Sequence, residues 1–285
     1  MDPVTWTSRP DLDRPVLIAA FRGWNDGGEA ATTAAAYLRD RWGAEPLADI
    51  DPDGFLDFQM TRPTVRLEDG ITRTIEWPEL RFSAARVNGR DAVVFLGIEP
   101  NVRWRAFVET FLATVRDIGV GEVVTLGAFL ADVPHTFPTP VTGLAVDAER
   151  SRELGLTSSR YEGPTGIVGV VHDALARGGF AASSLWAAVP HYLPGGPNPK
   201  AALALVQKIV ALTGLPAHTD TLDRAAGSWE SQVTSTISEN AELVAYVRRL
   251  EELAGERGGP SEIPSGDALA AELERFLREQ RGDSG

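Results

Sequence analysis

The stretch VLIAAFRGWNDGGEAATTAAAYLRDRW, residues 16–42, joins an apolar run, a glycine-containing loop and a helical segment. The uninterrupted apolar residues 16–21 are typical of a buried strand. Residues 29–42 predict a helix, and Asp26 followed three residues later by Glu29 resembles a capping box with aspartate in place of serine or threonine. The stretch therefore predicts a strand, a loop and a helix in direct succession, which is the repeating unit of α/β proteins.

The same alternation continues along the chain, with one interruption by hairpins. Residues 64–96 alternate around Asp69-Gly70 and Asn88-Gly89, two dipeptides that favour tight hairpin turns, and lead into a strand at 92–96. Helices are predicted at 104–118, 163–179 and 199–212, and strands at 122–130, 143–146 and 184–190. Strands that alternate with helices of this length predict a largely parallel sheet with helices on both faces.

After residue 220 the sequence contains no further strand pattern. Apolar residues at helical spacing predict one long amphipathic helix; they are Leu222, Trp229, Val233, Ile237, Val244, Val247 and Leu250. A glycine- and proline-containing segment at 255–266 precedes a second amphipathic helix at 267–281. We therefore expect a core domain at 1–219 and a helical C-terminal extension at 220–285. Because isolated helices are marginal in water, the extension must pack on the core or on another subunit.

Composition excludes several classes of function. The 285 residues, 43% of them hydrophobic, are those of an ordinary globular protein, and no apolar run approaches the roughly 18 residues of a membrane span. A net charge of −13 disfavours nucleic-acid binding. The absence of cysteine excludes disulfides, thiolate catalysis and cysteine metal sites. With no secretory pattern at the N-terminus, we expect a cytoplasmic protein without a membrane partner.

Polar residues gather where the predicted strands end, which is the edge where ligands usually bind in an open parallel sheet. They follow the first strand, the central strand and the last two parallel strands, and two more precede the helix at 163–179. The predicted binding cleft contains Asn25, Asp26, Glu29, Glu99, Asn101, Arg103, Asp132, His135, Glu162, Thr165, His191 and Lys200.

Each group in this cleft also has a structural interpretation. The glycines after Asp26 expose amides that suit an anion, but Asp26 and Glu29 favour capping of those amides. Thr165 is expected to cap the following helix. His135 with Asp132 has the pattern of an oriented general base, although a structural or exposed histidine is favoured in a proline-rich loop. Arg103 suits an anion, although ion pairs with nearby acids are favoured.

Motifs of the common enzyme classes are absent. The sequence contains no G-x-S-x-G nucleophile elbow and no H-E-x-x-H metal motif, and no G-x-G-x-x-G follows the first strand. We therefore predict no catalytic residues, no metal site and no cofactor.

Six segments together resemble the actinobacterial branch of the proteasome-assembly-chaperone family, of the second-subunit type. They are GWNDGGEAAT, EPNVRWRAF, LGAFLADVPHT, RYEGPTGIVGVVHDA, SLWAAVPHY and PNPKAALAL. The C-terminal pattern YVRRLEELAGE, followed by PSGDALAAELERFLRE, is similar to the same branch. The resemblance implies an α/β/α sandwich related to nucleoside phosphorylases, self-association with a trimer favoured, and protein partners. It carries over no catalytic residue.

Two hypotheses follow from these observations. The first is an oligomeric, non-enzymatic scaffold or assembly factor, which accounts for the resemblance and for the amphipathic extension. The second is an enzyme or small-molecule binder of the nucleoside phosphorylase or hydrolase type, which accounts for the polar rim. The second requires that Arg103, Asp132, His135 and His191 converge on an open site.

Overall fold

A computed structural model describes residues 3–69, 71–145, 148–153, 155–156, 162–193 and 195–256. The strands are β1 (Val4–Trp6), β2 (Val16–Arg22), β3 (Glu45–Ile50), β4 (Thr64–Glu68), β5 (Thr72–Glu76), β6 (Arg81–Val87), β7 (Arg90–Ile98), β8 (Glu122–Ala131), β9 (Val141–Leu144) and β10 (Ala181–Pro190). The helices are α1 (Ala30–Trp42), α2 (Trp104–Ile118), α3 (Ala148–Glu153), α4 (Ile167–Arg177), α5 (Pro199–Thr213), α6 (Asp220–Ser238) and α7 (Ala241–Glu256).

Eight of these strands form one sheet, in the order β1-β3-β6-β7-β2-β8-β10-β9. The four central strands β7, β2, β8 and β10 are parallel to one another. The flanking strands are antiparallel to their neighbours, with β6, β3 and β1 on one side and β9 on the other. Because the four central strands run the same way, their carboxyl ends meet at one edge of the sheet, as the sequence predicted.

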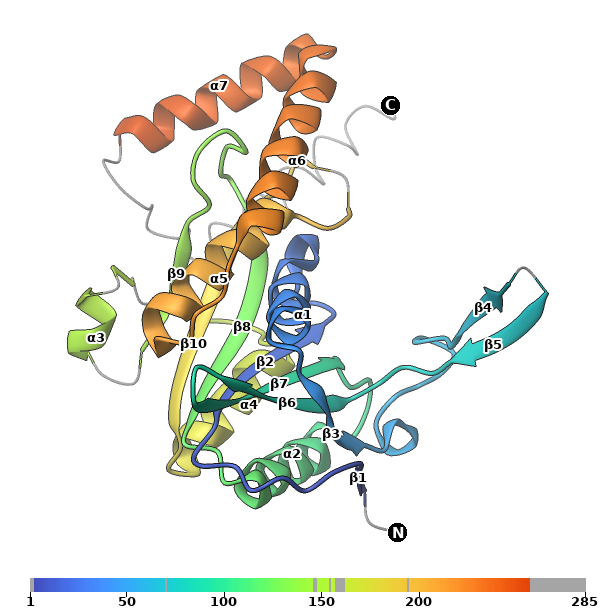
Figure 1. Ribbon diagram of the computed structural model, residues 1–285. Coiled ribbons are helices and arrows are strands. Elements are labelled where there is room, and N and C mark those ends of the chain that lie inside the picture. The colour runs from blue at the N-terminus through green and yellow to red at the C-terminus, as the bar shows by residue number, and fades with distance from the viewer. Residues whose placement is uncertain are drawn as a thin grey trace.

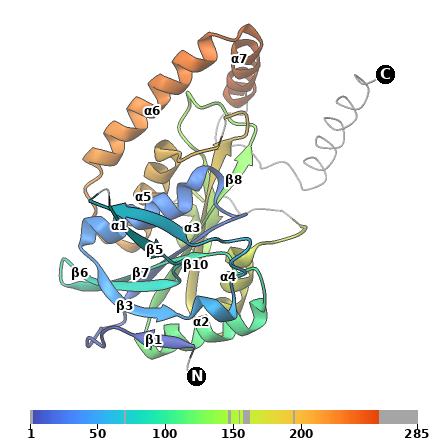
Figure 2. The same ribbon diagram turned by 90° about the vertical axis from the view of Figure 1, so that its right-hand side faces the viewer.

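Helices cover both faces of this sheet (Figure 1, Figure 2). On one face, α1 and α5 pack over a core that includes Ile18, Leu126 and Leu205. On the other face, α2 and α4 pack over a core that includes Leu17 and a group of phenylalanines such as Phe95. Successive residues of β2 point into opposite cores, which is why an uninterrupted apolar run was needed. The fold is a three-layer α/β/α sandwich, and the predicted fold class is confirmed.

Both predicted hairpin turns form, but the two hairpins have different surroundings. Asn88 and Gly89 have positive φ angles of 46° and 81° and join β6 to β7 within the main sheet. The hairpin around Asp69, which has a φ of 52°, pairs β4 with β5 in a separate two-stranded sheet. Strand β9 lies two residues earlier than predicted. Strand β3 was missed because its sequence, EPLADI, contains a proline and two acidic residues that are unfavourable in strands.

The predicted single helix from residue 220 is wrong, because the chain turns between α6 and α7. Asn240 supplies the physical reason: its side-chain oxygen accepts bonds from the Glu242 and Leu243 amides, at 3.0 and 3.2 Å, and so begins a new helix. The two helices extend at an angle to each other beyond the sheet (Figure 1). The helix predicted at 267–281 lies outside the described residues. In the described part of the chain, no helix has both the length and the hydropathy to cross a bilayer.

Candidate functional site

The predicted rim residues lie in segments that follow β2, β7, β8 and β10, at the shared carboxyl edge of the sheet. Their side chains do not form one open cleft. They divide into separate groups, each of which is held by a neighbouring element of the chain.

Asn25 and Glu99 form the first group, at the beginning of α4. The Glu99 carboxylate accepts one bond from the Ile167 amide at 2.8 Å and another from the Trp24 amide at 3.2 Å. Asn25 is only 7% exposed, and its side-chain oxygen has no hydrogen-bond partner among the described residues. A Cβ on Gly166 would lie 2.0 Å from that oxygen and 2.8 Å from a Glu99 oxygen. The absent side chain of Gly166 therefore allows these three residues to meet.

The predicted cap at Thr165 is wrong. Gly166 is the N-cap residue of α4. The first amide of the helix, that of Ile167, donates to the carboxylate of Glu99, which lies far away along the chain. Thr165 and Glu162 are both exposed. The hydrogen-bond acceptor at the start of α4 is therefore Glu99, which follows β7. The spacing of residues within 163–179 carries no signal of this partner.

Asp26 binds the first turn of α1, but it is not the N-cap residue that the sequence predicted, because a short 3-10 helix at Gly27–Glu29 intervenes and Glu29 is the N-cap of α1. Its carboxylate accepts bonds from the Ala31 and Thr32 amides, at 2.8 and 3.2 Å, and from the Thr32 hydroxyl. Burial raises the pKa of Asp26 above its usual value, and these hydrogen bonds oppose the shift. The reciprocal half of the capping box is wrong, since Glu29 has a left-handed φ of 48° and makes no side-chain cap bond. The amides that Asp26 occupies are those of Ala31 and Thr32, and not those of Gly27 and Gly28 that the sequence analysis considered for an anion.

Asn101 and Arg103 form a separate group that orders the loop before β4. The Asn101 side-chain oxygen accepts bonds from the Asp57 amide at 2.8 Å and the Thr61 hydroxyl at 3.3 Å. The Arg103 guanidinium lies 5.8 Å from the centre of the Phe55 ring. Both predicted residues therefore have contacts that fix a loop, and both remain exposed.

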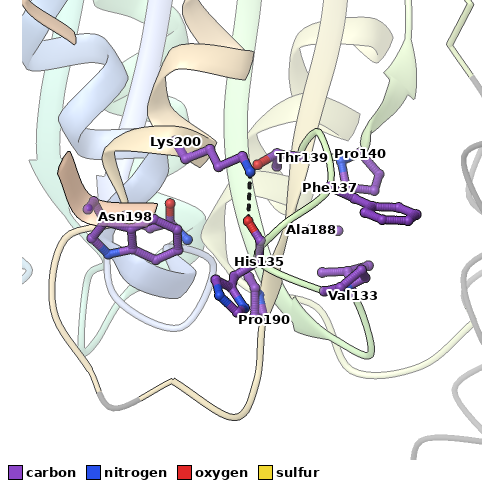
Figure 3. Close-up of a pocket in the computed structure, with 11 residues that line it drawn as sticks. Val133, His135, Phe137, Thr139, Pro140, Ala188, Pro190, Asn198 and Lys200 are labelled. Atoms are coloured by element: carbon purple, nitrogen blue, oxygen red, sulfur yellow. Dashed lines mark hydrogen bonds between the residues drawn. The ribbon is translucent and has the colours of Figure 1, made fainter. Parts of the chain in front are cut away.

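His135 is the centre of the last group and is 3% exposed. Its Nδ1 lies 2.8 Å from the Tyr192 hydroxyl, and its Nε2 lies 3.0 Å from the Thr234 hydroxyl of α6. The Lys200 amine donates to the His135 carbonyl oxygen at 2.6 Å, the bond drawn in Figure 3. The same amine pairs with Glu230 of α6. We call these contacts between His135, Lys200 and α6 the latch.

Helix α7 extends this arrangement with contacts of its own. Tyr246 donates to Asp132 at 3.2 Å, and Asp132 pairs with His191 at 3.0 Å. The Thr136 hydroxyl donates to Glu251 at 2.5 Å. Asp132, His135, His191 and Lys200 are thus brought together. Helices α6 and α7 cover His135 and Lys200, whereas the side chains of Asp132 and His191 are 50% and 41% exposed. The partners on α6 and α7 leave no local signal in the sequence because they lie 30 to 115 residues away along the chain.

A small hollow remains beside the latch, between the loop after β8, the end of β10 and α6 (Figure 3). It contains about 200 Å³ of empty space, part of which is open solvent. Its lining includes Val133, Phe137, Pro190 and Trp229 and is mainly apolar. Among the described residues, no three histidine, aspartate or glutamate side chains are grouped to hold a metal ion. In the described part of the chain, Arg103 contacts Phe55, whereas Asp132, His135 and His191 contact Tyr192, α6, α7 and one another, so the four residues of the enzyme hypothesis do not converge on one site.

We expect the stability of the protein to fall as the pH drops below about 6.5. Burial, aided by the charge of Lys200, lowers the pKa of His135 below 6.5, while Glu230 and Glu251 oppose the shift. His135 therefore binds a proton more readily in the unfolded chain than in the folded protein. Its contribution to the free energy of unfolding is complete above pH 6.5 and is lost as the pH falls below that value. Burial also lowers the pKa of His172, so this residue should likewise reduce the stability of the protein at low pH.

The measurement is the free energy of unfolding in urea between pH 5 and pH 7.5. A single histidine contributes a slope of up to about 1.4 kcal/mol per pH unit. His135→Gln should reduce that slope, whatever its effect on stability at pH 7.5. If His135→Gln left the slope of the free energy of unfolding against pH unchanged, the expectation that burial lowers the pKa of His135 would be wrong.

The fold and the covered rim together define a class: an α/β/α sandwich whose own C-terminal helices close part of the carboxyl edge. The model of the PAC2 family matches residues 20–237, and the chain belongs to this family. The family resemblance inferred from the sequence is therefore confirmed. No curated protein matches the chain.

Solved structures similar to this chain include two actinobacterial proteins. A PAC2 family protein from Streptomyces avermitilis is 45% identical, with a TM-score of 0.75, over 82% of this chain and 99% of that one. A proteasome-assembly chaperone homologue from Mycobacterium tuberculosis is 46% identical, with a TM-score of 0.74, over 81% and 99%. PbaB of Pyrococcus furiosus, an archaeal proteasome activator, shares the fold at 17% identity, with a TM-score of 0.65 over 83% and 99%.

Proposed function

We propose that this protein is a non-enzymatic assembly factor that acts as a homo-oligomer and binds subunits of a proteasome. The observation that carries the proposal is the 46% identity, over 81% of the chain, to a proteasome-assembly chaperone homologue. We take a trimer as the oligomer and the cytoplasm as the site of action. The cysteine-free sequence is consistent with a reducing compartment.

The covered rim supports a binding role over a catalytic one. Catalysis requires a base within about 2.6–3.2 Å of its target in an accessible site. His135 instead uses both ring nitrogens in contacts with Tyr192 and Thr234. Lys200 and Asp132 are engaged by α6 and α7. These side chains hold α6 and α7 in place. Such a structural role suits a protein that acts by binding partners at its surface.

The test is reconstitution of proteasome assembly from purified subunits of the source organism, with and without this protein. We expect the protein to co-migrate with an assembly intermediate on native gels and to accelerate the appearance of complete particles. An unrelated acidic protein of similar mass serves as the control. A folded, oligomeric preparation that neither binds the subunits nor changes the rate of assembly would contradict the proposal.

A further inference from the structure

The turn between β6 and β7 consists of Asn88 and Gly89 and lies where β7 begins, at the edge of the sheet opposite the polar rim. Both residues are exposed, and their φ angles are 46° and 81°. Such positive angles are those of the tight turn that an asparagine–glycine pair favours. Val87 and Arg90, which flank the turn, form the last cross-strand pair of the hairpin. The turn therefore sets the register of β6 and β7 and is remote from the contacts described at the rim.

An asparagine followed by glycine places an electrophile and a nucleophile on adjacent residues. The backbone nitrogen of Gly89 can attack the side-chain carbonyl carbon of Asn88, because the closure forms a five-membered ring. The new N–C bond replaces the bond to the side-chain nitrogen, which leaves as ammonia, and the product is a cyclic imide. Water then opens the imide. Opening at the side-chain carbonyl gives aspartate, whereas opening at the backbone carbonyl gives isoaspartate, in which the main chain runs through the former side chain.

The surroundings of the turn leave this reaction unobstructed. A Cβ on Gly89 would meet nothing within 4 Å, so no neighbouring group shields the attacking nitrogen. Among the residues that the structure describes, the Asn88 side chain has no hydrogen-bond partner and the Gly89 amide has no acceptor. Ring closure requires the turn to leave its tight geometry for a moment, and the backbone freedom of glycine eases that change.

The four other asparagines of the chain each lack one of these conditions. Asn198 is 3% exposed and precedes a proline, whose nitrogen carries no hydrogen. Asn25 is 7% exposed. The side-chain oxygens of Asn101 and Asn240 accept bonds from backbone amides, at 2.8 and 3.0 Å. The combination of an exposed, unengaged side chain and a following glycine therefore singles out Asn88.

We propose that Asn88 is a site of spontaneous deamidation, which yields a mixture of aspartate and isoaspartate and makes the chain a substrate of isoaspartate-specific methyltransferases. The inference goes beyond the proposed function and does not depend on it. Isoaspartate adds one carbon to the main chain of a turn that has only two residues, so the pairing of Val87 with Arg90 should weaken. Either product also adds one negative charge to a chain whose net charge is already −13.

The test uses the full-length protein, incubated in its folded state at neutral and at mildly alkaline pH. Trypsin cleaves after Arg86 and Arg90 and so releases residues 87–90 as one peptide. We expect this peptide to gain one mass unit, to divide into two products of equal mass and to accept methyl groups from an isoaspartate methyltransferase. The reaction should be faster at the higher pH, because the nucleophile is the deprotonated backbone nitrogen. Asn88→Gly is the matched control, since a glycine pair keeps this type of turn but carries no amide.

Asn88→Gly should lose the methyl-accepting signal and keep an unchanged circular dichroism spectrum. A peptide 87–90 that stays unmodified, or isoaspartate that is shared evenly among the five asparagines, would overturn the proposal. The same conclusion would follow if Asn88→Gly accepted as many methyl groups as the unsubstituted protein. Hydrogen exchange measures the structural consequence: the amides of Val87 and Arg90 should exchange faster in the modified protein, while those of the central strand β2 should not change.

Discussion

Replacing Gly166 with alanine should lower the free energy of unfolding by roughly 2–4 kcal/mol. The added Cβ would lie 2.0 Å from the Asn25 side-chain oxygen and 2.8 Å from a Glu99 oxygen, so at least one of these side chains must move. Moving Glu99 breaks its bond to the first amide of α4, and moving Asn25 disturbs the loop after β2. The measurement is urea unfolding followed by tryptophan fluorescence, at one fixed protein concentration.

Gly195→Ala is the matched control for this variant. Gly195 lies in the loop after β10, and a Cβ there meets nothing within 4 Å. We expect a change of no more than about 0.5 kcal/mol at this position. In an Asn25→Ala background, where the nearer oxygen is absent, Gly166→Ala should cost less than it does alone. Equal costs in the two backgrounds would show that Asn25 is not what requires glycine at this position.

Replacing Lys200 with methionine should release the latch and destabilise the protein by roughly 1–3 kcal/mol. The Lys200 side chain is 15% exposed, and its amine binds both the His135 carbonyl and the Glu230 carboxylate. Methionine keeps the unbranched, apolar part of the side chain but leaves both oxygens without their donor. Hydrogen exchange should quicken in α6 and α7 more than in the sheet, because the latch joins these helices to the rim.

Arg177→Met provides the comparison for this prediction. Arg177 pairs with Asp173 one helical turn away on α4, and the two side chains are 79% and 57% exposed. Exposed pairs of this kind contribute only about 0.3–0.5 kcal/mol. If Lys200→Met cost no more than Arg177→Met, or if exchange in α6 and α7 did not change, the latch would not be what holds the helices.

These two predictions concern different parts of the same rim. Around Glu99 and Gly166, the rim is closed by the beginning of α4, an element of the sandwich itself. Around His135 and Lys200, it is closed by α6 and α7, which follow the last strand. Release of the latch would therefore expose the second part of the rim and leave the first part intact.

The main strands and helices of the sandwich were predictable because their signals are local. An apolar run such as residues 16–21 fits a strand buried on both faces, and Asn88-Gly89 supplies the positive φ angles of a two-residue turn. Spacing alone also gave helix α2 its exact bounds. Strand β3 could not be found in this way, since its burial depends on pairing with β6 and not on its own composition.

The sequence predicted where the candidate site lies on the sheet, but not how its side chains are arranged. Parallel strands bring their carboxyl ends to one edge, so the segments that contain Asn25, Glu99, Asp132 and His191 had to share that edge. The partner of each side chain was not predictable, because Glu99 meets Ile167 and Thr136 meets Glu251 across long separations in the chain.

By itself, the sequence determined a parallel sheet with helices on both faces and the edge where polar residues gather, since periodicity and turn residues act over a few neighbouring positions. The family followed from the resemblance of whole segments and not from periodicity. Only the tertiary structure decided that α6 and α7 close over His135 and Lys200, that Gly166 must lack a side chain, and that the hairpin of β4 and β5 keeps an apolar face exposed. Those outcomes depend on which distant surfaces meet, and hydrogen bonding and packing between distant segments leave no periodic signal in the chain.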